Sequence, residues 1–153
     1  MRWNQGRDVI DAMLESGELQ RVPPSRDRAD QLGQADAHLV TARLVAANDP
    51  EGAYALLYDA ARKALVGLLE NQGLRPTSRA GHHGTYQAVK AQLVPPLGSA
   101  LRPYERMRRR RNEIEYPDFI GAPLTVDDIL EDAKAAESLV AMIRKVYDEM
   151  SAF

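Results

Sequence analysis

An arginine cluster late in the chain is the first group of residues that could do chemistry. Four consecutive arginines at 108–111 follow Arg106 and precede Asn112, Glu115 and Tyr116. Guanidinium groups bind phosphate oxygens through paired N–H donors, so the cluster suggests a site for RNA or a nucleotide. Neighbouring helical residues point about 100° apart, however, and the four arginines cannot all face one ligand. The other interpretation is a solvated helix face with local ion pairs.

Two further polar groups could join such a site. His82 and His83 lie in a segment that is expected to be a loop, from which a side chain could reach over a cleft. Either histidine could instead cap the helix that follows. Asp59 lies one helical turn from Arg62 and Lys63, so it either forms a local ion pair or holds an arginine of the cluster in place.

Composition limits the classes of protein. The chain has 153 residues, 44% hydrophobic and 27% charged, and is expected to form a single soluble, cytoplasmic domain, with 1–24 as an N-terminal helix and linker and 25–153 as a bundle. The formal net charge is -2, so nucleic-acid binding must come from local patterning. The absence of cysteine excludes disulfides and thiolate metal sites. No membrane association, metal or other cofactor is expected.

The elements that must position these residues are predicted to be helices. Ala, Leu, Arg, Glu and Gln are abundant, and no segment alternates with period two. The first helix is expected over about residues 3–15. The second is expected to begin after the N-cap Ser25 and to reach about Ala47. Its apolar stripe has helical spacing and consists of Leu32, Ala35, Leu39, Ala42 and Ala46.

The third predicted helix has the clearest boundaries. Asp49 is the expected N-cap, Pro50 fits the first helical position, and Gly73 lies where a C-terminal cap belongs. The broad apolar surface between them predicts a central helix that packs on more than one side. A loop over 75–84 and a short helix over about 85–93 should follow.

The arginine cluster belongs to the next predicted helix, over about 97–116. Pro103 should interrupt this helix or start its regular part, and Pro117 should end it. The last helix is expected to begin at Thr125, with Asp128 completing a capping box. Together these elements predict an all-α, up-and-down bundle of about five or six helices.

The arginine cluster resembles the signature of the HEPN domain superfamily. In that superfamily an Arg with a polar neighbour precedes a His by a few residues, late in the second of two long antiparallel helices. Arg111 and Asn112 match this pattern, and Tyr116 stands at the His position. The resemblance extends to Tyr58–Ala64 in the preceding long helix and to Gly81–His83, and it is closest to a group of actinobacterial HEPN proteins. It implies a homodimeric helical bundle with a metal-independent endoribonuclease site in the dimer cleft.

The resemblance also implies which residues form the site. Arg111, Asn112 and Tyr116 would be the catalytic residues, supported by Asp59 and Glu115. A tyrosine at the histidine position departs from the pattern, because its ordinary pKa of about 10 makes it a poor base near neutral pH. The residues expected to bind RNA or nucleotide are Arg106, Arg108, Arg109, Arg110 and His83.

Three functions remain open. The resemblance implies a toxin–antitoxin or defence protein that binds RNA or a nucleotide, with or without cleaving it. A nucleotidyltransferase-type antitoxin modifies a motif tyrosine in related systems, so Tyr116 is also a candidate for modification. The third function is a non-catalytic interaction module, in which the arginines pair with the acidic last helix inside a dimer. Its acidic residues are Asp127, Asp128, Glu131 and Asp132.

Overall fold

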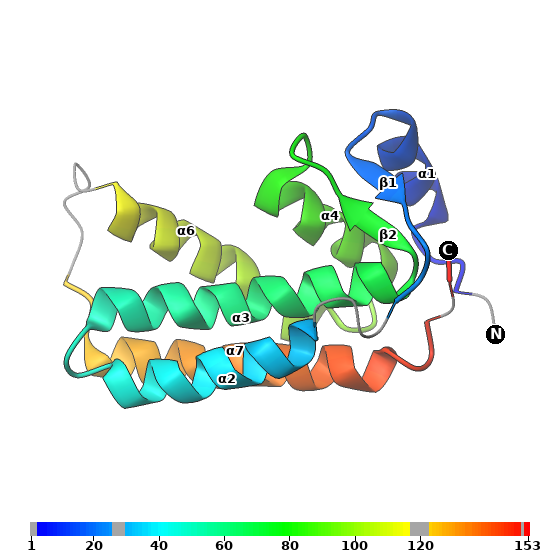
Figure 1. Ribbon diagram of the computed structural model, residues 1–153. Helices are drawn as coiled ribbons and strands as arrows, with labels where there is room; N and C mark the ends of the chain where they lie inside the picture. Colours follow the sequence, from blue (N-terminus) through cyan, green and yellow to red (C-terminus); the bar gives the residue numbers. More distant parts are fainter. Residues whose placement is uncertain (1–2, 26–29, 117–122, 151) are drawn as a thin grey trace.

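The structure is a computed structural model that describes residues 3–25, 30–116, 123–150 and 152–153. Most of these residues lie in helices, which confirms the predicted all-α class (Figure 1). In chain order the elements are α1 (Arg7–Glu15), β1 (Leu19–Arg21), α2 (Gln31–Val45), α3 (Pro50–Asn71), β2 (Leu74–Pro76), α4 (Gly81–Leu93), α5 (Gly98–Leu101), α6 (Pro103–Glu115) and α7 (Val126–Val146). Among the described residues, no helix is long and apolar enough to cross a membrane.

Helix α3 is the centre of the bundle, as its broad apolar surface predicts. It contacts α2 and α7 on one side and α6 and α4 on another (Figure 1). Its tyrosines Tyr54 and Tyr58 are buried together with Leu57, Ala61 and Leu65. Residues on more than one side of α3 are therefore removed from water. The helix can position polar groups toward α2 and α7 and also toward α6 and α4.

Local signals determine several helix boundaries. The Asp49 carboxylate accepts a hydrogen bond of 2.9 Å from the backbone N–H of Gly52, and Pro50 begins α3. Thr125 and Asp128 form the expected capping box at the start of α7. Pro103 begins α6, and the short α5 precedes it. These predictions are confirmed because each boundary depends only on residues that are close together in sequence.

The predicted start of the second helix is wrong. Helix α2 begins at Gln31, and Asp30 is its N-cap, with its carboxylate accepting from the backbone N–H of Gly33. Ser25 instead donates its backbone N–H to the carbonyl of Glu70 at 3.1 Å. Ser25 is therefore bound to the end of α3, through a contact that sequence spacing does not reveal.

The predicted loop over 75–84 is also wrong in part. Helix α4 begins at Gly81, so His82 and His83 lie in its first turn. The start of this loop forms β2, which pairs with β1 in an antiparallel ladder that places Leu19 opposite Pro76. Three-residue strands are too short to show an alternating pattern, and the pairing joins distant segments. The pair and α1 lie at the same end of the molecule as the C-terminus (Figure 1).

Candidate anion-binding site

Helix α6 directs two of its arginines to one buried carboxylate. Asp132 of α7 lies 2.6 Å from Arg106 and 3.3 Å from Arg110, and its side chain is only 3% exposed. The Tyr54 hydroxyl donates to the same carboxylate at 2.8 Å. Arg106 and Arg110 are therefore compensated within one chain, by an acidic residue of the last helix that the interaction-module hypothesis placed inside a dimer.

The next arginine of the cluster is also compensated. Arg108 donates to Glu105 at 3.3 Å, and His83 lies 3.7 Å from the other oxygen of Glu105. Arg109 is exposed and has no ion pair within the described part of the chain. The predicted RNA-binding residues thus face several directions, as the 100° step of a helix requires.

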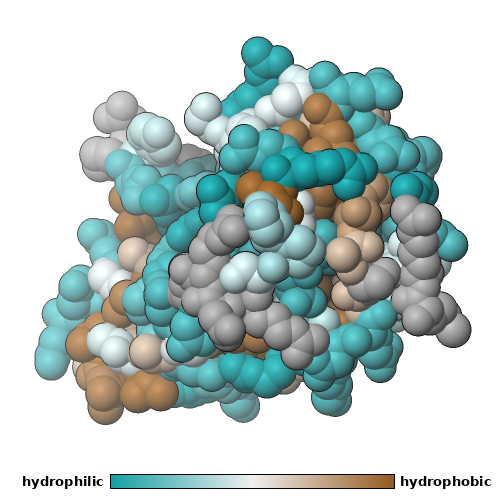
Figure 2. All heavy atoms as spheres, turned by 45° about the vertical axis from the view of Figure 1, so that its right-hand side comes forward, coloured by the Kyte–Doolittle hydropathy of each residue, from teal (hydrophilic) through white to brown (hydrophobic). Residues whose placement is uncertain are grey.

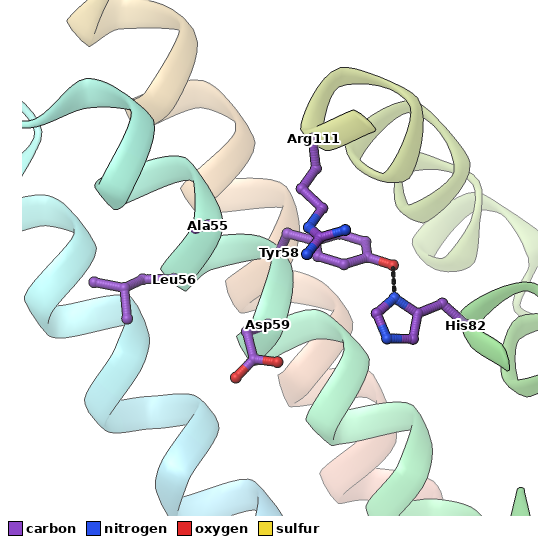
Figure 3. Close-up of a pocket in the computed structure, with 6 residues that line it drawn as sticks. All are labelled: Ala55, Leu56, Tyr58, Asp59, His82 and Arg111. Atoms are coloured by element: carbon purple, nitrogen blue, oxygen red, sulfur yellow. Dashed lines mark hydrogen bonds between the residues drawn. The ribbon is translucent and has the colours of Figure 1, made fainter. Parts of the chain in front are cut away.

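Arg111 differs from its neighbours because it lies over an aromatic ring. Its guanidinium carbon is 5.4 Å from the centre of the Tyr58 ring, within the range of a cation–π contact. One of its nitrogens also pairs at 2.8 Å with Glu115, four residues further along the helix. Arg111 and Tyr58 line a pocket of about 300 Å³ together with Ala55, Leu56, Asp59 and His82 (Figure 3).

His82 is the histidine that reaches Arg111's pocket, whereas the sequence favoured His83. The Tyr58 hydroxyl lies 3.1 Å from Nδ1 of His82 (Figure 3). It also lies 3.2 Å from the Tyr104 hydroxyl. Helices α3, α4 and α6 supply one member each of this hydroxyl–imidazole chain. The chain therefore fixes the three helices around the pocket.

Asp59 also lines the pocket, and its carboxylate contacts several basic side chains. Arg62 donates to one carboxylate oxygen from two nitrogens, at 2.9 and 2.7 Å. His38 and Lys63 lie 3.3 and 3.4 Å from the other oxygen. The local ion pair expected for Asp59 is confirmed. The structure does not bring Asp59 to Arg111 as an ion pair, although both line the same pocket.

The protonation states in the pocket follow from its cations. Partial burial, with the positive charges of Arg62 and Arg111, lowers the pKa of His82. Burial raises the pKa of Tyr58 and outweighs the opposing effects of Tyr104 and Arg111. Burial alone would raise the pKa of Asp59, but Arg62 and Lys63 lower it. At neutral pH His82 is thus uncharged, Tyr58 is protonated and Asp59 is ionised.

The other predicted catalytic residues lie outside the pocket. Tyr116 follows the last residue of α6, is 69% exposed and, among the described residues, forms no side-chain hydrogen bond or ring contact with Arg111. Asn112 accepts the backbone N–H of Tyr116 through its carbonyl at 3.1 Å. Pro117 lies outside the described residues, but α6 ends at Glu115, as the proline predicts. The structure therefore brings together Arg111, Asp59 and the candidate His82, and adds Tyr58 and, bonded to it, Tyr104.

Sequence reasoning assigned no site role to Tyr58 or Tyr104 and placed His83, rather than His82, among the binding residues. One signal was available: Tyr54 and Tyr58 lie one turn apart on the apolar surface of α3, and a buried tyrosine needs a partner for its hydroxyl. No local signal distinguishes His82 from His83, because the packing of α4 on α3 decides which of them turns inward. Within the described residues, no group of three acidic or histidine side chains could hold a metal ion.

Comparison with protein-family models, with curated proteins and with solved structures finds no match for this chain. The chemistry open to the pocket follows from its own geometry. The arrangement offers a stacked guanidinium, an imidazole and a nearby Arg62 beside one half-buried carboxylate. Such a set is suited to binding an anion with several oxygens.

Proposed function

We propose that this protein binds RNA or a nucleotide, and that the Arg111 pocket takes a phosphate group. The observation that carries the proposal is the Arg111 guanidinium placed over Tyr58, next to His82. A guanidinium held on an aromatic ring can present to phosphate oxygens the N–H groups that do not pair with Glu115. The pocket volume of about 300 Å³ lies at the lower end for small-ligand sites and suits one nucleotide unit.

The proposal includes the setting that the HEPN resemblance implies, a homodimer in a toxin–antitoxin or defence system. Apolar surface for a second copy is available on the outer face of α2, where Val40 and Leu44 are 61% and 75% exposed. They lie four residues apart and so share a helix face. Figure 2 shows that the surface is mostly hydrophilic but carries separate hydrophobic patches. A Leu44→Glu variant should be more monomeric than the wild type in light scattering after size exclusion.

The test of binding is fluorescence anisotropy with a short single-stranded RNA in EDTA. We expect Arg111→Ala to weaken binding about tenfold, the effect of one charge-assisted contact. Arg109→Ala is the matched control, because Arg109 lies on the same helix and is exposed without an ion pair in the described residues. It should change the affinity less than about threefold. Equal losses in the two variants would contradict a specific site at Arg111.

Metal-independent RNA cleavage is the second candidate function. It requires a neutral histidine beside an arginine, in which the imidazole lone pair faces the attacking hydroxyl and the arginine stabilises the phosphate. Which ring nitrogen of His82 carries the hydrogen therefore decides between the two candidates. Incubation of the same RNA with wild-type protein in EDTA, followed by gel analysis, separates the candidates. Products that disappear in Arg111→Ala would establish cleavage, and intact RNA with Arg111-dependent binding would establish a non-catalytic protein.

Modification of Tyr116 is compatible with either candidate, because its side chain is 69% exposed and outside the pocket. A nucleotidyltransferase-type antitoxin could reach this hydroxyl without opening the bundle. Intact-mass spectrometry of protein isolated from its native host checks this point. A mass increase of one nucleotide that Tyr116→Phe abolishes would support it.

A further inference from the structure

The buried hydroxyl of Tyr104 restricts how hydrogen bonds can run in the pocket. Its side chain is 0% exposed, and the Tyr58 hydroxyl at 3.2 Å is its only hydrogen-bond partner among the described residues. A buried O–H without an acceptor is strongly disfavoured. Tyr104 therefore donates, and Tyr58 accepts.

The next bond in the chain follows from the first. With its oxygen accepting from Tyr104, Tyr58 directs its own hydrogen to Nδ1 of His82 at 3.1 Å. A neutral imidazole that accepts at Nδ1 carries its hydrogen on Nε2. The reverse direction would satisfy His82 but would leave the Tyr104 hydrogen in the core without an acceptor.

We infer that Tyr104 and Tyr58 hold His82 as a neutral donor, whose Nε2–H binds a phosphate oxygen in the Arg111 pocket. This inference rests on the proposed function and specifies its ligand contacts. Figure 3 shows the second ring nitrogen turned away from Tyr58, and Nε2 has no hydrogen bond within the described residues. Arg111 and His82 both contact Tyr58, so one ring positions a charged donor and an uncharged one.

The same arrangement argues against His82 as the base in RNA cleavage. An imidazole with hydrogen on Nε2 has no free lone pair facing the pocket, and a proton added at Nδ1 would break the bond from Tyr58. The charges of Arg62 and Arg111 disfavour the imidazolium as well, which agrees with the lowered pKa of His82. In this arrangement His82 and Arg111 hold the phosphate group as two different donors, and neither of them removes a proton from the RNA.

Nitrogen-15 NMR of the histidine rings in the free protein tests the protonation directly. In the wild type we expect His82 to carry its hydrogen on Nε2, with Nδ1 unprotonated. Tyr58→Phe keeps the ring beneath Arg111 but removes the hydroxyl, and should give a mixture of the two neutral forms. Tyr104→Phe is the matched variant, because it retains the Tyr58 hydroxyl but removes the donor that fixes the direction of its hydrogen bond. It should also shift His82 toward a mixture of the two neutral forms. Hydrogen on Nδ1 in the wild type, or no change in Tyr58→Phe, would overturn the inference.

Affinity for a short uridine RNA tests the role of the donor. His82→Gln places an amide N–H near the position of Nε2 and should keep the affinity within about threefold, whereas His82→Ala should lose about five- to tenfold, the equivalent of one hydrogen bond. Because His82 is exposed, both variants should fold. Equal losses in the two variants would overturn the donor role. A wild-type protein with no RNA affinity would overturn the proposed function and the phosphate ligand, while NMR would still decide the direction of the hydroxyl chain.

Discussion

The two sides of α6 use the same residue type for different purposes. Arg106 and Arg110 form ion pairs with the buried carboxylate of Asp132, which also accepts a hydrogen bond from the Tyr54 hydroxyl. Arg111 lies over the ring of Tyr58 at an open pocket, and its ion pair with Glu115 is at the surface. An arginine that is matched by a buried carboxylate holds helices together, and an arginine placed on an aromatic ring remains able to bind a ligand.

The difference arises from what each side of α6 faces. Toward α7 the neighbour is an acidic side chain with 3% exposure, where an unpaired charge would be costly. Toward α3 and α4 the neighbours are tyrosines and a neutral histidine, which support a cation without neutralising it. The number of arginines in the sequence is therefore larger than the number that are free of a buried ion pair.

The largest expected effect is on the Asp132 side. Asp132→Asn removes the charge that compensates Arg106 and Arg110, and we expect it to lower the free energy of unfolding by about 3 kcal/mol. Glu137→Gln is the control, because Glu137 pairs with Arg43 at the surface and should cost less than about 1 kcal/mol. Urea denaturation followed by circular dichroism measures both variants. A similar small loss in each would contradict the structural role of Asp132.

The Arg111 side should respond in binding rather than in stability. Arg111→Lys retains the charge but loses the planar contact with Tyr58 and the paired donors, so we expect RNA affinity to fall about fivefold. The free energy of unfolding should change by less than about 1 kcal/mol, since the pair with Glu115 is exposed. Anisotropy and urea denaturation of the same sample separate the two effects. Unchanged affinity would mean that charge alone suffices.

Salt dependence tests how many arginines reach the RNA. Because Arg106, Arg108 and Arg110 are already paired, the logarithm of the binding constant should fall against the logarithm of salt concentration with a slope of roughly -1 to -2. Arg111→Ala should reduce the slope by about 0.7. A wild-type slope near about -3.5 would indicate that all five arginines contact phosphates.

A smaller effect is expected at the surface partner of Arg111. Glu115→Gln removes the carboxylate that competes with phosphate for the guanidinium, and should raise RNA affinity about twofold. Glu113→Gln changes the net charge equally, on an exposed residue of the same helix without an ion pair in the described residues. An equal gain in both variants would mean that net charge, and not competition at Arg111, controls binding.

The smallest effect is on the pH dependence of stability. The pKa of His82 is lower in the folded protein than its ordinary value of about 6.5, so the unfolded chain takes up the proton first as the pH falls. The neutral form therefore contributes stability above about pH 6.5 that is lost as the pH falls toward the lowered value. Unfolding free energies of the wild type and His82→Gln from pH 8 to 5 should diverge in that direction. A constant difference across this range would contradict a lowered pKa.

Several features were predictable because their causes are local. The caps at Asp49 and Thr125 depend on residues three positions away, and the pair of Arg111 with Glu115 depends on one helical turn. The packing of α3 on more than one side was predictable from its broad apolar surface. Ser25 is not the cap because α2 begins later, at Gln31, where the Asp30 carboxylate accepts from the backbone N–H of Gly33, and Ser25 instead contacts the end of α3 through Glu70.

The sequence by itself determined a helical protein with a cationic segment near the end of α6. Only the tertiary structure decided which arginines stay available. Asp132 is distant in sequence from Arg106 and Arg110, and Tyr58 is distant from Arg111. The packing of α7, α3 and α4 on α6 determines which of these side chains each arginine contacts. The same packing chose His82 over His83, since adjacent helical residues point about 100° apart and only the docking of α4 turns one of them toward Tyr58.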